Sequence, residues 1–171
     1  MTDHGTYVER DGRPAVRFER TYPHPIERVW QAVTDPTELK YWFPSPEVSY
    51  DARVGGRIEL GGDPNIDSSE ATVLAWDPPH RFAFQWGPDE LHFTLESTAD
   101  GCRFELVNVL SEQNTAARNA AGWEVCLAEL GKLIAGTPGS GPQSEDTLPF
   151  DPLYDAYVAA GVPSGAAIPG R

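Results

Sequence analysis

The chain has 171 residues, with 26 Asp and Glu against 13 Lys and Arg, which gives a formal net charge of −13. This length suits one domain with at most an appendage. An acidic surface repels phosphate backbones and anionic lipid headgroups, so the charge disfavours nucleic-acid binding and membrane-surface roles. No apolar run approaches the roughly 18 residues of a membrane span, and a signal-peptide pattern is lacking. We therefore expect a cytoplasmic protein without membrane insertion.

The first elements predicted along the chain are a β-hairpin and two short helices. Residues 7–9 lead into the turn dipeptide Asp-Gly at 11–12, and residues 16–22 then alternate in polarity like a half-buried strand. An apolar stripe with helical spacing predicts a helix over residues 25–34. The capping pattern Asp-Pro-Thr-Glu predicts a second helix over residues 35–43, which must end before the prolines that follow.

The middle of the chain is predicted as an antiparallel meander. Short strands follow one another at close spacing, and turns rich in Gly, Pro and Asp separate them. The expected strands cover residues 48–52, 57–60, 70–76, 91–98 and 102–110, with an aromatic strand that ends at residue 86. In that strand Phe82, Phe84 and Trp86 share one face of the sheet, because strand side chains alternate. So much aromatic surface indicates either a very large core or the wall of a cavity.

A long helix and an appendage complete the chain. Apolar residues at intervals of three and four predict a helix over about residues 114–135. Gly122 inside this helix costs about 1 kcal/mol relative to Ala, which indicates a close approach or free space beside Trp123. We expect residues 1–136 to form the main domain. Residues 137–171 are expected to comprise a Gly/Pro-rich linker, a short docking helix at about residues 150–160 and a loose tail.

Five short stretches, in order along the chain, carry a resemblance to a known superfamily. They are Val29-Trp30-Gln31-Ala32-Val33-Thr34-Asp35-Pro36, Leu39 to Pro44, Val54-Gly55-Gly56-Arg57, Asp77 to Trp86 and Gly122-Trp123-Glu124. The chain resembles the START-like (SRPBCC) superfamily, in the group similar to the C-terminal domain of the heat shock protein 90 ATPase activator. The resemblance implies an α+β helix-grip fold, in which a curved antiparallel sheet with two short helices wraps around a long C-terminal helix.

The resemblance also implies a cavity between the sheet and the long helix. The residues expected to line it are Trp30, Trp42, Phe43, Phe82, Phe84, Trp86, Phe104, Leu106, Asn108, Trp123 and Leu127. The alternative is that these rings fill the space as a packed core. Alternation places Asn108 on the inner face, where its amide needs partners, either from a ligand or from a neighbouring helix or backbone.

No residue pattern in the sequence indicates catalysis or metal binding. The four histidines form no metal-ligand motif, and Cys102 and Cys126 have no neighbouring Cys or His at ligand spacing. Cys126 falls within the helical apolar pattern, so we expect a free core thiol. We therefore expect no cofactor, no metal and no catalytic residue.

Three functions are compatible with the sequence. The first is non-catalytic binding of a small hydrophobic or aromatic molecule by a monomer or weak homodimer. The second is regulation of a chaperone ATPase, which only the resemblance suggests and which the acidic surface disfavours. The third is a polyketide cyclase-like activity, which would require at least one ionisable side chain facing the cavity.

Overall fold

The computed structural model describes residues 4–63 and 69–168 as a single curved sheet with four α-helices in those ranges. The elements in chain order are β1 (Thr6–Arg10), β2 (Arg13–Tyr22), α1 (Ile26–Thr34), α2 (Pro36–Leu39), β3 (Glu47–Tyr50), β4 (Arg57–Gly61), β5 (Ser69–Asp77), β6 (Arg81–Trp86), β7 (Asp89–Thr98), β8 (Gly101–Val109), α3 (Ala116–Ile134) and α4 (Phe150–Ala159). A short 3₁₀ turn, η1 (Gln113–Thr115), precedes α3.

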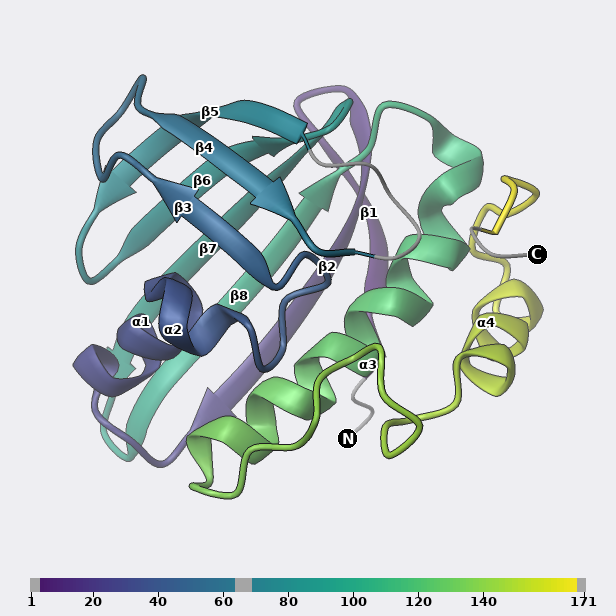
Figure 1. Ribbon diagram of the computed structural model, residues 1–171. Coiled ribbons are helices and arrows are strands. Elements are labelled where there is room, and N and C mark those ends of the chain that lie inside the picture. Colours follow the sequence, from purple (N-terminus) through teal and green to yellow (C-terminus); the bar gives the residue numbers. More distant parts are fainter. Residues whose placement is uncertain (1–3, 64–68, 169–171) are drawn as a thin grey trace.

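The eight strands form one antiparallel sheet in the order β1-β2-β8-β7-β6-β5-β4-β3. Only the β2–β8 pair joins strands that are not consecutive in the chain. The sheet curves around α3, while α1 and α2 lie together beside the strands and α4 lies beyond α3 (Figure 1). This arrangement confirms the predicted helix-grip fold, including the meander and the long helix.

Local sequence explains the first hairpin and the two short helices. Asp11 and Gly12 both have positive φ angles, 52° and 78°, as a two-residue turn of this twist requires. The side chain of Asp35 accepts a hydrogen bond from the backbone N–H of Thr37 at 2.9 Å, which caps α2. The second helix is shorter than predicted. It ends at Leu39, and residues 40–45 form turns and bends. A residue directly before a proline disfavours the helical conformation, which agrees with an end before Pro44.

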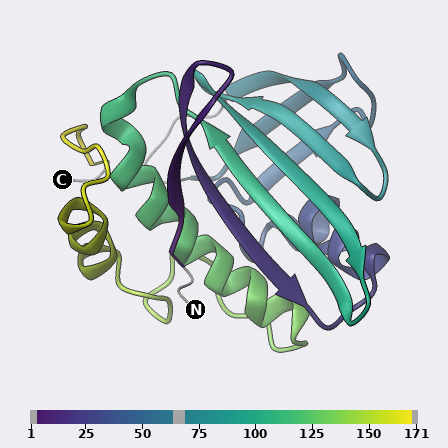
Figure 2. The same cartoon turned by 180° about the vertical axis from the view of Figure 1, so that it is seen from behind.

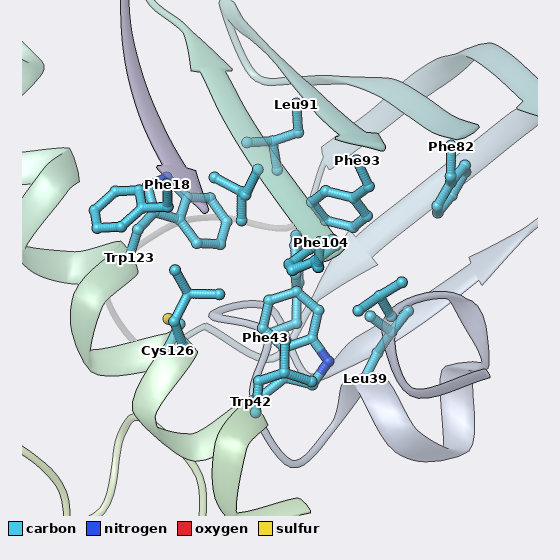
Figure 3. Packing of buried hydrophobic residues seen from close by; sticks show 14 of the residues in the cluster. Phe18, Leu39, Trp42, Phe43, Phe82, Leu91, Phe93, Phe104, Trp123 and Cys126 are labelled. Carbon is cyan, nitrogen blue, oxygen red and sulfur yellow. The ribbon is translucent and has the colours of Figure 1, made fainter. Parts of the chain in front are cut away.

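The core lies between the inner face of the sheet and α3. Trp42 and Phe43, which follow α2 in these turns, are both fully buried there. Trp42 Nε1 donates to the backbone carbonyl of Ala32 at 2.9 Å, so its one polar atom is satisfied. Figure 3 shows their rings between the helix and the strands that carry Phe93 and Phe104. The turns that follow α2 therefore place two large aromatic side chains in the space that the sheet encloses.

The C-terminal segment packs on the side of α3 away from the sheet (Figure 2). Tyr157 of α4 is buried, and its hydroxyl donates to Glu124 Oε1 at 2.8 Å. The backbone N–H of Ala117 donates to the carbonyl of Pro163 at 2.9 Å, which satisfies one of the free donors at the start of α3. The expected loose tail thus has contacts with α3 in its described part, and residues 169–171 lie outside the described residues.

Candidate ligand-binding site

Four aromatic rings form a continuous cluster between the sheet and α3. The ring centroids of Phe43 and Phe84 lie 6.0 Å apart, and those of Phe43 and Trp123 lie 5.8 Å apart. Trp86 completes the cluster, with its centroid 5.1 Å from that of Trp123. We call these residues, Phe43, Phe84, Trp86 and Trp123, the helix-side cluster. They come from the turn after α2, from β6 and from α3, so three separate parts of the chain build it.

The residues predicted to line a cavity are nearly all buried. Trp42, Phe82, Phe104, Leu106 and Leu127 belong to the same apolar core as the helix-side cluster. Among the predicted residues, only Trp30 and Trp86 are half-buried. At these two side chains, the predicted lining reaches the surface.

Trp30 lies at the other end of the aromatic core from Trp86. Phe82 joins the two ends, because its ring centroid is 5.3 Å from that of Trp76 and 5.0 Å from that of Phe84. The centroid of Trp30 is 5.3 Å from that of Trp76, and Trp76 in turn lies 5.7 Å from Tyr50. We call Trp30, Tyr50 and Trp76 the α1-side cluster. The hydroxyl of Tyr50 donates to the carbonyl of Thr34, the last residue of α1. Burial raises the pKa of Tyr50 to about 12. One hydrogen bond thus joins the α1-side cluster to the C-terminal end of α1.

Asn108 is completely buried and bonds to the neighbouring helix. Its Oδ1 accepts from Trp123 Nε1 at 3.1 Å and from Asn119 Nδ2 at 2.9 Å. Its Nδ2 donates to Asp89 Oδ2 at 3.2 Å. Of the two kinds of partner expected for this amide, the structure provides the helix. The bonds also fix the plane of the Trp123 ring in the helix-side cluster.

Asp89 is the acceptor at the centre of this polar network, and the sequence analysis did not identify it. The residue is 8% exposed. Oδ2 accepts from Asn108 and, at 3.3 Å, from Asn119, while Oδ1 accepts from the backbone N–H of Ser111 at 3.0 Å. The sequence predicts this strand only from residue 91, after a turn that includes Gly87, Pro88 and Asp89, but β7 already begins at Asp89. Strand side chains alternate between the two faces, so an extension of the strand from Leu91 to Asp89 places Asp89 on the same inner face as Leu91.

Gly122 leaves space on the helix next to this network. A Cβ atom built on Gly122 meets no described heavy atom within 4 Å beyond its own helix backbone and its neighbours in the chain. Gly122 directly precedes Trp123 and lies one turn after Asn119. Of the two predicted reasons for a glycine here, free space is the one that agrees with the described residues, since none of them approaches Gly122 closely.

The thiols of the site region are unsuited to reaction, and the described residues contain no metal centre. Cys102 and Cys126 are free and buried, as expected for core thiols. Burial raises the pKa of the Cys126 thiol, and the carboxylates of Asp63 and Glu129 raise it further. In residues 4–63 and 69–168, no group of three His, Cys, Asp or Glu side chains could hold a metal ion.

Two surface depressions of the described residues lie away from the aromatic clusters. One, of about 520 Å³, is lined by Glu47, Val48, Ser49, Glu59, Leu60, Gly61 and Glu70. Arg57 forms ion pairs with Glu59 and Glu70, so part of this acidic lining is already neutralised. The other, of about 360 Å³, lies at the connection between β2 and α1. Neither depression is lined by the aromatic clusters.

The fold and the sequence together identify the family. Residues 23–135 match the model of the family described as Activator of Hsp90 ATPase homolog 1-like protein, and the chain belongs to this family. The match confirms the resemblance and covers the tandem helices, the meander and α3. No helix in the described residues is long and apolar enough to cross a membrane. No curated protein matches the chain in sequence.

Several solved structures share the fold. The solution structure of CalU16 from Micromonospora echinospora is 26% identical, with a TM-score of 0.71 over 90% of this chain and 88% of that chain. DynU16, a protein of the dynemicin biosynthetic locus, is 25% identical, with a TM-score of 0.63 over 74% of this chain and 50% of that chain. EF2215 from Enterococcus faecalis, a conserved protein of unknown function, is 19% identical with a TM-score of 0.72, covers 91% of this chain and 89% of that chain, and bears on the fold alone.

Proposed function

We propose that this protein binds a small hydrophobic or aromatic molecule at the helix-side cluster, between the sheet and α3, without catalysing a reaction. One observation carries the proposal: ring contacts run without a break from buried Phe84 through Phe43 and Trp123 to half-buried Trp86. A planar apolar molecule that reaches Trp86 would extend this series of ring contacts. No described atom beyond the helix itself lies within 4 Å of a Cβ position on Gly122, which adds room at the same place.

The comparisons support a role with a small molecule without naming one. DynU16 comes from a biosynthetic locus, and it shares both the fold and a quarter of its aligned residues with this chain. Proteins of one fold serve many functions, so the local chemistry has to carry the argument. We place the protein in the cytoplasm as a monomer or weak homodimer, with residues 1–136 as the binding domain and residues 137–171 as a segment docked on α3.

The cyclase-like alternative needs an ionisable side chain on the inner face, and Asp89 provides one. Its carboxylate already accepts three hydrogen bonds from amide groups, which suits a fixed acceptor better than a group that gives and takes protons. The chaperone-regulating alternative rests on the family description, and no feature of the described surface favours it over ligand binding.

Two glycines of α3 offer a matched test. At both Gly122 and Gly131, a Cβ would meet no described atom within 4 Å beyond the helix itself, but Gly122 directly precedes Trp123 of the polar network. We expect Gly122→Leu to weaken binding of 2-naphthol, measured by isothermal titration calorimetry, by roughly tenfold. Gly131→Leu should leave the affinity within about twofold of the unaltered protein.

The control separates a blocked site from a disturbed helix. Both substitutions replace a helical glycine by a better helix former, so both should raise rather than lower the melting temperature. Equal affinities in the two variants would contradict the proposed position of the site. Failure of a panel of bicyclic aromatics and lipids to bind the unaltered protein would contradict the proposed function itself.

A further inference from the structure

The polar network at the edge of the helix-side cluster has one acceptor with spare capacity. Asn108 Oδ1 already takes two hydrogen bonds, from Trp123 and Asn119. Asp89 Oδ2 also takes two, but Oδ1 takes a single one, from the backbone N–H of Ser111, among the described residues. An ionised carboxylate has about four acceptor positions, so roughly one remains on Asp89 Oδ1.

Asp89 lies next to the half-buried ring that marks the proposed binding place. Trp86 and Asp89 are direct partners across the β6–β7 pair, so their side chains leave the same face of the sheet. Asp89 as a residue retains 8% exposure, and Trp86 is half-buried. A molecule in contact with the outer side of Trp86 would therefore be within reach of a carboxylate oxygen.

The charges around this place favour a donor and disfavour an anion. In the described part of the chain, the partners of Asp89 are amide groups, and no ion pair to Arg or Lys reaches it. Two guanidinium groups bond to neighbours of Asp89 and not to Asp89 itself: Arg118 donates to Asn119 Oδ1 at 3.0 Å, and Arg13 donates to Glu90 Oε2 at 2.8 Å. Asp63 lies near Cys126, one turn beyond Gly122 on α3, and adds negative potential. The whole chain carries a net charge of −13.

We infer that the site selects aromatic molecules that carry a hydrogen-bond donor, a phenolic hydroxyl or an amine, and that Asp89 Oδ1 is the acceptor. This inference rests on the proposed function and adds a specificity to it. A ligand donor buried among the aromatic rings without an acceptor would weaken binding, because it would lose its hydrogen bond to water. Asp89 supplies a charge-assisted acceptor at the rim of the cluster. Aromatic carboxylates are excluded, because they would place a second negative charge beside Asp89.

Three ligands with one ring system test the inference on the unaltered protein. 2-Naphthol carries a donor, 2-methoxynaphthalene has the same ring without a donor, and 2-naphthoate is an anion at neutral pH. We expect 2-naphthol to bind roughly tenfold more tightly than each of the other two in isothermal titration calorimetry. In ¹H–¹⁵N spectra it should shift the Ser111 amide signal, because that N–H is bonded to Asp89 Oδ1.

A variant assigns the preference to Asp89. Asp89→Asn should reduce the ratio of the 2-naphthol and 2-methoxynaphthalene affinities to about one, while the exposed control Asp100→Asn keeps the ratio of the unaltered protein. Equal binding of the three ligands to the unaltered protein would overturn the inference and leave the proposed function standing. Binding of none of the three would overturn both. If Asp89→Asn does not fold, the ligand series and the Ser111 signal still decide the question.

Discussion

The helix-side and α1-side clusters lie at two ends of one aromatic core, joined through Phe82, and they differ in the polar groups beside them. In the α1-side cluster, Tyr50 donates one hydrogen bond to a helix carbonyl, and Trp30 and Trp76 contact other rings. In the helix-side cluster, Trp123 belongs to a network with Asn108, Asn119 and Asp89. Half-buried aromatic side chains are therefore not enough to define a site here. The polar network beside them makes the difference, because it can select a ligand as well as hold it.

The largest expected effect concerns the two tryptophans at the centres of these clusters. Trp123→Ala removes a ring that is 2% exposed and also removes a donor from Asn108, so we expect a loss of about 4 kcal/mol in the free energy of unfolding. Trp76→Ala removes a half-buried ring and should cost about half as much. Urea unfolding followed by circular dichroism measures both. A greater loss in Trp76→Ala would reverse the assigned importance of the two clusters.

A medium effect is expected when one polar group is removed from each cluster. Asn108→Leu leaves Trp123 Nε1 without its acceptor and Asp89 with one donor fewer, at a cost of about 2–3 kcal/mol. Tyr50→Phe removes a single hydrogen bond from a half-buried ring and should cost about 1 kcal/mol. The same urea titration measures both losses in the free energy of unfolding. Equal losses would show that the network contributes no more to stability than the single hydrogen bond of Tyr50.

The smallest effect is a pH dependence that belongs to the α1-side cluster. Folding raises the pKa of Tyr50 from its ordinary value of about 10 to about 12. Below the unfolded pKa the stabilising contribution is complete, and it is lost as the pH rises through the folded pKa, since the unfolded chain ionises first. For a half-buried ring the loss should be about 1 kcal/mol. Unfolding between pH 9 and pH 12 should depend less on pH in Tyr50→Phe; an unchanged profile would contradict this origin.

The sequence predicted the features that depend on local periodicity. The aromatic face of β6 follows from alternation, and the structure places Phe82 and Phe84 in the core. The long helix follows from spacing of three and four, and the observed α3 begins and ends within two residues of the predicted bounds. The shared face of Phe104, Leu106 and Asn108 on β8 was likewise predicted, because period two fixes the face once one member is known.

The rest depends on contacts between distant parts of the chain. Asp89 was missed because Gly-Pro-Asp is a common turn sequence, and only the pairing of Asp89 with Trp86 shows that the strand starts there. Asn119 was missed because a polar residue on a helix is usually solvated, and its partners come from β7 and β8. The division of Trp30 and Trp86 between two clusters depends on the curvature of the sheet, which local sequence does not determine.

The indole N–H signals of the five tryptophans provide the most direct test of the binding site. Trp86 and Trp123 lie in the helix-side cluster, and Trp30 and Trp76 lie in the α1-side cluster, so each cluster has two reporters. Addition of 2-naphthol to the ¹⁵N-labelled protein should shift the signals of Trp86 and Trp123 in proportion to occupancy and leave those of Trp30 and Trp76 unchanged. Shifts confined to Trp30 and Trp76, or no shift at saturating ligand, would contradict the proposed site.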